Sequence, residues 1–248
     1  MATTRYLIVN ADDFGRNPGV NLGIIKAHEQ GIVTAASLMV RWPAATEAAD
    51  YCRGYRDLSL GLHFDFGEWV CRNGTWLPVY QVVFPENVVN VTEEVSRQLE
   101  SFRALVGRDP THIDSHQHFH RREPFRSALL AIASELKIPL RDCSPEVRYC
   151  GGFYGQTAEG APNPEAITVE GLIKILAALG PGLTELGCHP GEGDDLDETY
   201  CSEREQEVKT LCNLQVQAAI ASMEIELCSF GRTTSNSERS YHQTGGDF

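Results

Sequence analysis

The feature that most constrains the fold is a short apolar run, Tyr6–Val9, that leads directly into two adjacent carboxylates. The run is typical of a buried strand, and the polar segment Asn10–Gly15, with Asp12 and Asp13 at its centre, stands where the strand gives way to a loop. In barrels and open α/β sheets, reacting groups gather at the carboxyl ends of the strands. Because two neighbouring acids beside a buried strand need a cation to offset the cost of burying their charge, we predict a divalent metal ion here.

Apolar runs bounded by turn signals alternate with amphipathic stretches along the whole chain. This alternation indicates an α/β fold with a mostly parallel sheet. Three helices carry clear end signals: one from Asn17 and Pro18 to Gly31, one from Thr92 to Gly107 and one from Thr168 to Gly180. The predicted strands are Tyr6–Asn10, Thr34–Val40, Leu58–Phe64, His112–Ser115, Pro139–Arg141, Thr184–His189 and Ile225–Phe230.

The chain length fits one domain with one sizeable core. The sequence has 248 residues, of which 42% are apolar. We predict a single domain over residues 1–231 and a polar, disordered tail over residues 232–248. Two long irregular stretches, 67–90 and 144–163, hold tryptophans and tyrosines that either bind sugar rings or pin these loops to the domain.

The acidic charge limits the classes of partner. A formal net charge of −13 argues against nucleic acid and anionic membranes, which select for basic patches. No segment approaches the roughly 20 apolar residues of a membrane span, and the first residues lack the features of a signal peptide. Since the 8 cysteines are scattered and form no C-x-x-C pair, we expect reduced thiols and a cytoplasmic protein.

Histidines lie at the ends of three other predicted strands. They are His63, the histidines of the segment His112–His120, and His189. Each one alone also fits a structural role, and the Asp pair also fits a cap for the helix that begins near Asn17. All carboxyl ends of a parallel sheet open on one face, however, so these groups converge and indicate a metal site.

The mixture of acids and imidazoles favours hydrolytic chemistry. Two histidines and one carboxylate leave coordination positions for water and for a carbonyl oxygen, and the spare acid next door takes the proton of the water. His189 is placed to protonate a leaving amine, although packing against Pro190 is an alternative. Strand alternation would put residues 112, 114, 116, 118 and 120 on one face, so we assign His118 and His120 to the polar lining rather than to the metal.

Five segments together resemble the YdjC/ChbG/HpnK family of carbohydrate deacetylases. The resemblance spans most of residues 5–230, and the joint presence of Asn-Ala-Asp-Asp-Phe-Gly and Asp-Ser-His-Gln-His makes it specific. The matching segments are Val9–Gly15, Gly31–Thr34, Gly61–His63, Pro110–His118 and Cys188–Gly191.

The resemblance implies a distorted, TIM-barrel-like (β/α) barrel and metal-dependent removal of acetyl groups from N-acetylated sugars, either chito-oligosaccharides or glycolipid head groups. It further implies that Asp13, His63 and His116 bind one divalent ion, and that Asp12 is the general base. Zn²⁺ and Mg²⁺ are the first candidates for the ion, and Ni²⁺, Mn²⁺ and Co²⁺ are the others. Homodimers are common among such barrels, and the sequence leaves the oligomeric state open.

Two other functions stay open at this point. One is a different barrel hydrolase, amidohydrolase-like or phosphoesterase-like, although the first strand ends in Asp-Asp rather than in His-x-His. The other is a carbohydrate-binding protein without turnover. The presence of all the expected acids and histidines argues against it.

Overall fold

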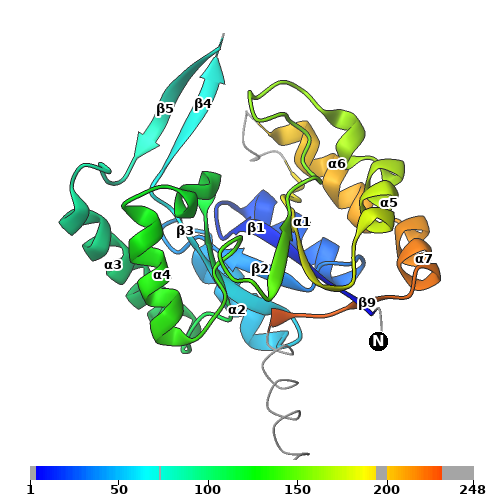
Figure 1. Cartoon of the computed structure of the whole chain (residues 1–248), viewed down its shortest axis with the longest axis horizontal. Helices are drawn as coiled ribbons and strands as arrows, with labels where there is room; N and C mark the ends of the chain where they lie inside the picture. The colour runs from blue at the N-terminus through cyan, green and yellow to red at the C-terminus, as the bar shows by residue number, and fades with distance from the viewer. Residues whose placement is uncertain (1–3, 73, 194–199, 231–248) are drawn as a thin grey trace, which may run out of the picture.

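A curved parallel sheet forms the centre of the molecule (Figure 1). The computed structural model describes residues 4–72, 74–193 and 200–230. Along the sheet the strand order is β6-β3-β2-β1-β8-β7, β9 also pairs with β1, and each of these pairings is parallel. The strands are β1 (Arg5–Phe14), β2 (Ala35–Leu38), β3 (Ser59–Phe64), β6 (Ile113–Ser115), β7 (Val147–Cys150), β8 (Gly182–Cys188) and β9 (Ile225–Leu227).

Helices connect the strands and cover the outside of the sheet (Figure 1). As predicted, Asn17 caps the first helix and Thr168 caps the fifth, each accepting a backbone N–H bond with its side-chain oxygen. The helices are α1 (Pro18–Glu29), α2 (Ala45–Gly54), α3 (Val88–Val106), α4 (Phe125–Leu136), α5 (Val169–Ala178), α6 (Cys201–Leu211) and α7 (Leu214–Ser222), with short 3-10 helices η1 (His116–Arg121) and η2 (Pro164–Ile167).

The expected α/β barrel is confirmed, and it is open. Among the described residues the end strands β6 and β7 do not pair with each other, so the sheet forms a half-barrel. The predicted strand Pro139–Arg141 is reduced to one bridge between Leu140 and Ile113 at this opening. Apolar side chains fill the space between sheet and helices, and β3 is buried along its whole length.

The two stretches predicted to be irregular contain regular structure. Residues 67–90 hold an antiparallel hairpin of β4 (Gly67–Arg72) and β5 (Thr75–Gln81), and residues 144–163 hold β7. The prediction missed the hairpin because its outer residues are exposed on both faces, so no alternating apolar pattern marks it.

The third helix begins earlier than predicted. Helix α3 starts at Val88 with Asn87 as its cap, and Thr92 lies inside it, where its hydroxyl donates to the Val88 carbonyl. Its predicted end at Gly107, in a left-handed conformation, is confirmed. The predicted tail, residues 232–248, lies outside the described residues, so the domain boundary at 231 stays a prediction. No helix in the described ranges has the length and apolar character needed to cross a bilayer.

Candidate metal and catalytic site

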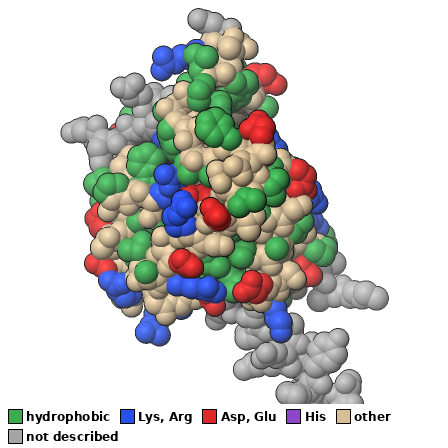
Figure 2. All heavy atoms as spheres, turned by 90° about the vertical axis from the view of Figure 1, so that its left-hand side faces the viewer, with side chains coloured by type: hydrophobic (Ala, Val, Ile, Leu, Met, Phe, Trp, Pro, Cys, Tyr) green, Lys and Arg blue, Asp and Glu red, His purple; other side chains and the backbone are tan. Residues whose placement is uncertain are grey.

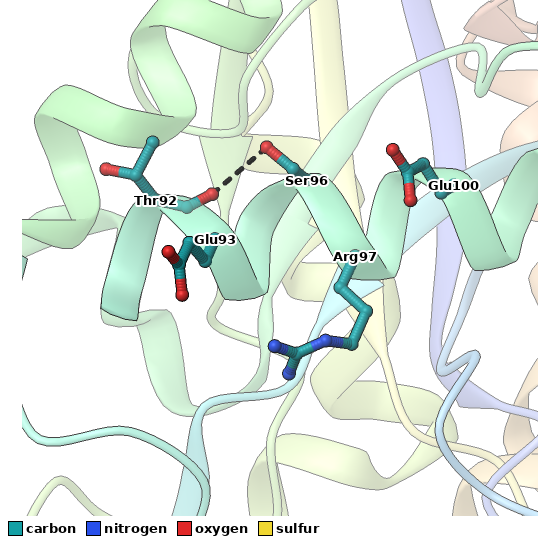
Figure 3. Close-up of a pocket in the computed structure, with 5 residues that line it drawn as sticks. All are labelled: Thr92, Glu93, Ser96, Arg97 and Glu100. Atoms are coloured by element: carbon teal, nitrogen blue, oxygen red, sulfur yellow. Dashed lines mark hydrogen bonds between the residues drawn. The ribbon is translucent and has the colours of Figure 1, made fainter. Parts of the chain in front are cut away.

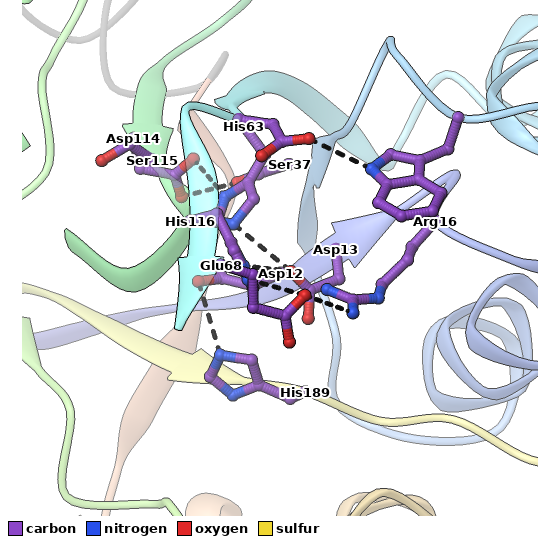
Figure 4. A network of polar contacts seen from close by, with 12 residues as sticks. Asp12, Asp13, Arg16, Ser37, His63, Glu68, Asp114, Ser115, His116 and His189 are labelled. Carbon is purple, nitrogen blue, oxygen red and sulfur yellow. Dashed lines mark hydrogen bonds and ion pairs between the residues drawn. The ribbon is translucent and has the colours of Figure 1, made fainter. Parts of the chain in front are cut away.

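The five residues predicted to carry the chemistry lie in one cavity at the carboxyl end of the sheet. Asp12 and Asp13 come from β1, and His63 comes from β3. His116 begins η1 directly after β6, and His189 follows β8. Because all four strands run in the same direction, their carboxyl ends meet at one edge (Figure 4).

The end of β1 is bent so that the two acids point in different directions. The pairing of β1 with β2 shifts register between Ala11 and Phe14. Asp13 has a φ of 68°, a left-handed conformation that aspartate tolerates better than most residues. Neither acid is needed as the cap of α1, since Asn17 fills that role with a 2.8 Å bond from the Val20 N–H. The interpretation of the Asp pair as a helix cap is therefore wrong.

Asp13, His63 and His116 form a group that fits one divalent ion. The Asp13 Oδ1 atom lies 3.1 Å from His116 Nδ1 and 3.4 Å from His63 Nε2, and one ligand atom of each residue lies within 4.8 Å of the others. The Nε2 atom of His63 is buried and has no hydrogen-bond partner, as expected for an atom that coordinates a metal ion. One carboxylate and two imidazoles are a common ligand set for zinc and related ions.

Further side chains fix the orientation of these ligands. Arg204 of α6 donates to the second oxygen of Asp13 at 2.6 Å, which leaves Oδ1 facing the histidines. His63 Nδ1 lies 2.8 Å from Asp114 Oδ1, the carboxylate–histidine pairing that orients metal ligands. Burial alone would lower the pKa of His63, but the neighbouring carboxylates raise it to about 10. Ion binding at this group therefore releases a proton.

Asp12 is held by a buried arginine. Arg141 donates to both oxygens of Asp12, at 2.6 and 2.7 Å, and Asn10 adds a third bond at 2.9 Å. The same guanidinium contacts Asp114 and Glu185, each at 2.7 Å. Burial alone would raise the pKa of Asp12, but Arg141 keeps it below its ordinary value. Asp12 is therefore an oriented carboxylate at neutral pH.

A second group with metal-ligand geometry, Asp12, His63 and Asp114, already contains a cation. The Arg141 guanidinium lies within 2.7 Å of both of its carboxylates. A second divalent ion would meet this positive charge at short range, so the geometry favours a single ion.

His189 completes the cavity wall beside Asp12. Its Nε2 lies 3.7 Å from Asp12 Oδ2, and its buried Nδ1 has no hydrogen-bond partner. Its backbone N–H donates to the buried Glu207. The loop after His189 packs against α1 through two glycines, because a Cβ on Gly23 would lie only 2.3 Å from the Gly191 Cα. Burial lowers the pKa of His189 to about 4, so its imidazole is neutral at pH 7 in the unliganded protein.

The segment after β6 departs from the predicted strand alternation. The strand ends at Ser115, and Gln117 and His118 adopt left-handed conformations within η1. His118 lines the cavity, as predicted for the polar lining. His120 turns back and shares a 2.8 Å contact with the Ser115 hydroxyl. Burial lowers the pKa of His118 to about 2 and that of His120 to about 3, so both rings are neutral at pH 7.

The sequence-based prediction omitted four charged residues of the site. Arg141 stands at the end of a predicted strand, so the strand-end rule that selected the histidines also pointed to it. Asp114 stood within the histidine-rich segment but was not assigned a role. Glu68, which is buried in an ion pair with Arg16 at 2.7 Å, and Arg204, on α6, gave no signal in sequence because their contacts are made across the fold.

A smaller depression of about 360 Å³ lies on the outer surface of α3. Figure 3 shows that its lining comes from successive turns of this one helix. The hydrogen bond marked in Figure 3 runs from the Ser96 hydroxyl to the Thr92 carbonyl within the helix. Its polar groups are those of an ordinary solvated helix surface, and we assign no function to it. The lining residues are Thr92, Glu93, Ser96, Arg97 and Glu100.

Comparisons with known proteins agree with the sequence resemblance. The family model described as YdjC-like protein matches residues 6–222. A carbohydrate deacetylase of Geobacillus stearothermophilus is 31% identical over 247 residues, which cover 91% of this chain and 97% of that protein. A chitooligosaccharide deacetylase of Serratia marcescens is 32% identical over 259 residues, which cover 91% of this chain and 98% of that protein.

Solved structures share the fold. A proposed cellobiose-phosphate cleavage protein from Enterococcus faecalis V583 has a TM-score of 0.74 and 26% identity, and the match covers 93% of this chain and 99% of that chain. A family 4 carbohydrate esterase from Streptomyces lividans has a TM-score of 0.51 at 10% identity, with 92% of this chain and 93% of that chain covered. The second likeness is one of fold alone.

Proposed function

Because the chain belongs to the YdjC-like family, whose model matches most of its length, we propose that it is a metal-dependent carbohydrate deacetylase. The reaction is hydrolysis of the acetamide group of an N-acetylated sugar to the free amine and acetate. The observation that carries the proposal is the meeting of a two-histidine, one-carboxylate group with a separate buried carboxylate and a third imidazole in one cavity. The deacetylases named above support the substrate class.

The proposed ligands of the ion are Asp13, His63 and His116. A divalent ion held there supplies Lewis acidity toward the acetamide oxygen and acidifies water. Two imidazoles suit Zn²⁺, Ni²⁺, Co²⁺ or Mn²⁺ better than Mg²⁺, which prefers oxygen ligands, so zinc is our first candidate.

Asp12 is the proposed general base. Its carboxylate is ionised and oriented by Arg141, and one side of it faces His189 across 3.7 Å. A base must reach the proton that it removes, and Asp12 lines the same cavity as the adjacent ligand Asp13. Asp12 accepts a proton from the attacking water as the C–O bond forms.

His189 is the proposed proton donor to the leaving nitrogen. Its imidazole is neutral before the reaction, since burial lowers its pKa to about 4. It therefore receives the proton during the cycle, from the direction of Asp12, and gives it to the amine as the C–N bond breaks. The proton that leaves water is thus the one that reaches the product amine, and the active site returns to its starting charge.

The Asp12→Asn variant tests this assignment. We expect it to retain the divalent ion and the fold but to lose most acetate release, because the amide cannot accept the proton. Asp109→Asn, at an exposed ion pair with Arg103, is the matched control and keeps wild-type turnover. Near-normal turnover of a metal-loaded Asp12→Asn protein would remove Asp12 from the mechanism.

The rival hydrolase classes are tested in the same assay. A phosphoester and lactone panel is run beside acetamido sugars, with the metal content measured by elemental analysis. Turnover of phosphoesters without acetate release would favour the other hydrolase. Sugar binding with no turnover on any panel member would favour a binding protein.

For the compartment we propose the cytoplasm, which is supported by the free thiols of Cys71, Cys150 and Cys188.

A further inference from the structure

The cavity that holds the catalytic groups extends well beyond them. Its volume is about 1260 Å³. Pockets for single small molecules usually span about 300–1,000 Å³. From the ligand group the cavity continues along β4 and β5 on one side and along residues 151–160 on the other. The space therefore exceeds what one acetamido sugar needs.

One face of the hairpin forms an aromatic wall of this extension. The register pairs Trp69 with Pro78 and Cys71 with Trp76, so strand alternation puts Trp69, Cys71 and Trp76 on the same face. All three line the cavity. The hairpin projects from the barrel (Figure 1), and hydrophobic side chains reach the surface at the upper end of the molecule in Figure 2.

The base of the hairpin is fixed and its outer part is open. The Gln117 side chain bonds both the N–H and the carbonyl of Trp69, at 3.0 and 2.7 Å, and the indole packs against Phe119. Trp76, farther out, keeps 52% of its surface exposed. The indole of Trp76 thus offers an aromatic surface near the outer end of a hairpin whose base is anchored through Trp69.

The opposite wall is polar and close. A Cβ built on Gly160 would lie 3.3 Å from the Cys71 Cβ, so this loop reaches the inner face of the hairpin. Gln156 and Thr157 also line the cavity. An aromatic face opposed by amide and hydroxyl groups suits a sugar ring, which has apolar C–H faces and a polar rim, better than it suits an acyl chain.

The ring on Trp76 is a different ring from the one that reacts. Glu68 Oε2 lies 3.9 Å from His116 Nε2, so this end of β4 lies beside the ligand group. From Glu68 to Cys71, the pairing partner of Trp76, the strand advances by about 10 Å. This distance is greater than the width of one sugar ring.

We propose that Trp76 forms a second sugar subsite: one ring of an N-acetylated oligosaccharide stacks on this indole while another ring presents its acetamide to Asp12 and His189. The inference rests on the proposed function and adds to it a specificity-determining residue, Trp76, which acts on oligomers and not on the monosaccharide.

The test compares acetate release from N-acetylglucosamine and from its β-1,4 dimer and tetramer by wild type, Trp76→Ala, Trp76→Phe and Leu77→Ala. Leu77 is the matched control, because it is an exposed residue of the same strand that does not line the cavity. We expect Trp76→Ala to raise KM for the tetramer by roughly 3- to 10-fold with little change in kcat, and to leave the monosaccharide unaffected. Trp76→Phe restores most of the loss, and Leu77→Ala behaves as wild type.

Equal effects of Trp76→Ala on monomer and tetramer, or no effect on either, would overturn the subsite. Calorimetric titration of the tetramer into Asp12→Asn and into Asp12→Asn/Trp76→Ala measures binding without turnover. If wild type releases no acetate from any sugar, the proposed function fails, and the titration still decides the subsite. Weaker binding in the double variant supports it, and equal or absent binding in both proteins refutes it.

Discussion

Replacement of Arg141 by methionine should destabilise the protein more than any surface change. Arg141 is 3% exposed, and its guanidinium bonds or pairs with Asp12, Asp114 and Glu185 at 2.6 to 2.7 Å. Methionine fills much of the volume but leaves three buried acids without their shared cation. Removal of one partner from a buried ion pair costs about 3–5 kcal/mol. For a chain of this size that loss lowers Tm by roughly 6–20 °C.

The pH dependence of this loss identifies its cause. Burial raises the pKa of Glu185 to about 7 even with Arg141 present. Without the guanidinium the three acids take up protons more readily, so the penalty should be smaller at pH 5 than at pH 8. Urea unfolding of wild type and Arg141→Met at pH 5 and pH 8 measures this difference in the free energy of unfolding. Arg103→Met, at an exposed ion pair, is the control and should cost less than about 1 kcal/mol.

Two results would refute this reasoning. One is an Arg141→Met protein whose free energy of unfolding lies within about 1 kcal/mol of wild type at pH 8. A loss that small is typical of an exposed ion pair, whereas the loss of the cation from a buried charge cluster should cost more. The other is a loss that does not change with pH, which would attribute the effect to packing rather than to charge. Arg141→Lys separates the two further, because it keeps the charge but cannot bond both oxygens of Asp12.

Three further changes have defined outcomes. Asp13→Asn should reduce the bound divalent ion from about one per chain to nearly none, measured by elemental analysis after dialysis, because the ligand group loses its carboxylate; full retention would place the ion elsewhere. His112 is buried, and burial lowers its pKa to about 3, below the unfolded value near 6.5, so the unfolded chain binds the extra proton and stability falls as the pH falls. The loss of stability from this group is about 2 kcal/mol between pH 7 and pH 5, and urea unfolding of His112→Gln should show a correspondingly smaller change of stability with pH. Gly23→Ala should cost about 1–3 kcal/mol in thermal unfolding, since its Cβ would lie 2.3 Å from the Gly191 Cα, whereas an unchanged Tm would mean that the two segments separate easily.

Local sequence was sufficient wherever a short-range rule applied. The apolar run before Asp12 predicted β1 because a buried strand needs only consecutive apolar residues, and Asn17 with Pro18 predicted the start of α1 because a cap acts within one turn. The placement of Asp12, Asp13, His63, His116 and His189 at the carboxyl ends of strands predicted their meeting, since parallel strands share one direction. This reasoning holds without any knowledge of which strands are neighbours.

The contacts that tune the site depend on residues far apart in sequence, and only the tertiary structure decided them. Arg141 reaches Asp12 across 129 positions and Arg204 reaches Asp13 across 191, and no local pattern encodes such pairs. The hairpin also escaped prediction, because its exposed strands carry no burial pattern and its position beside the cavity follows from the bonds between Gln117 and Trp69. The sequence by itself determined which chemical groups stand at the strand ends, whereas the fold decided their charge states, their orientation and the wall that a substrate meets, because these depend on burial and on distances between remote segments.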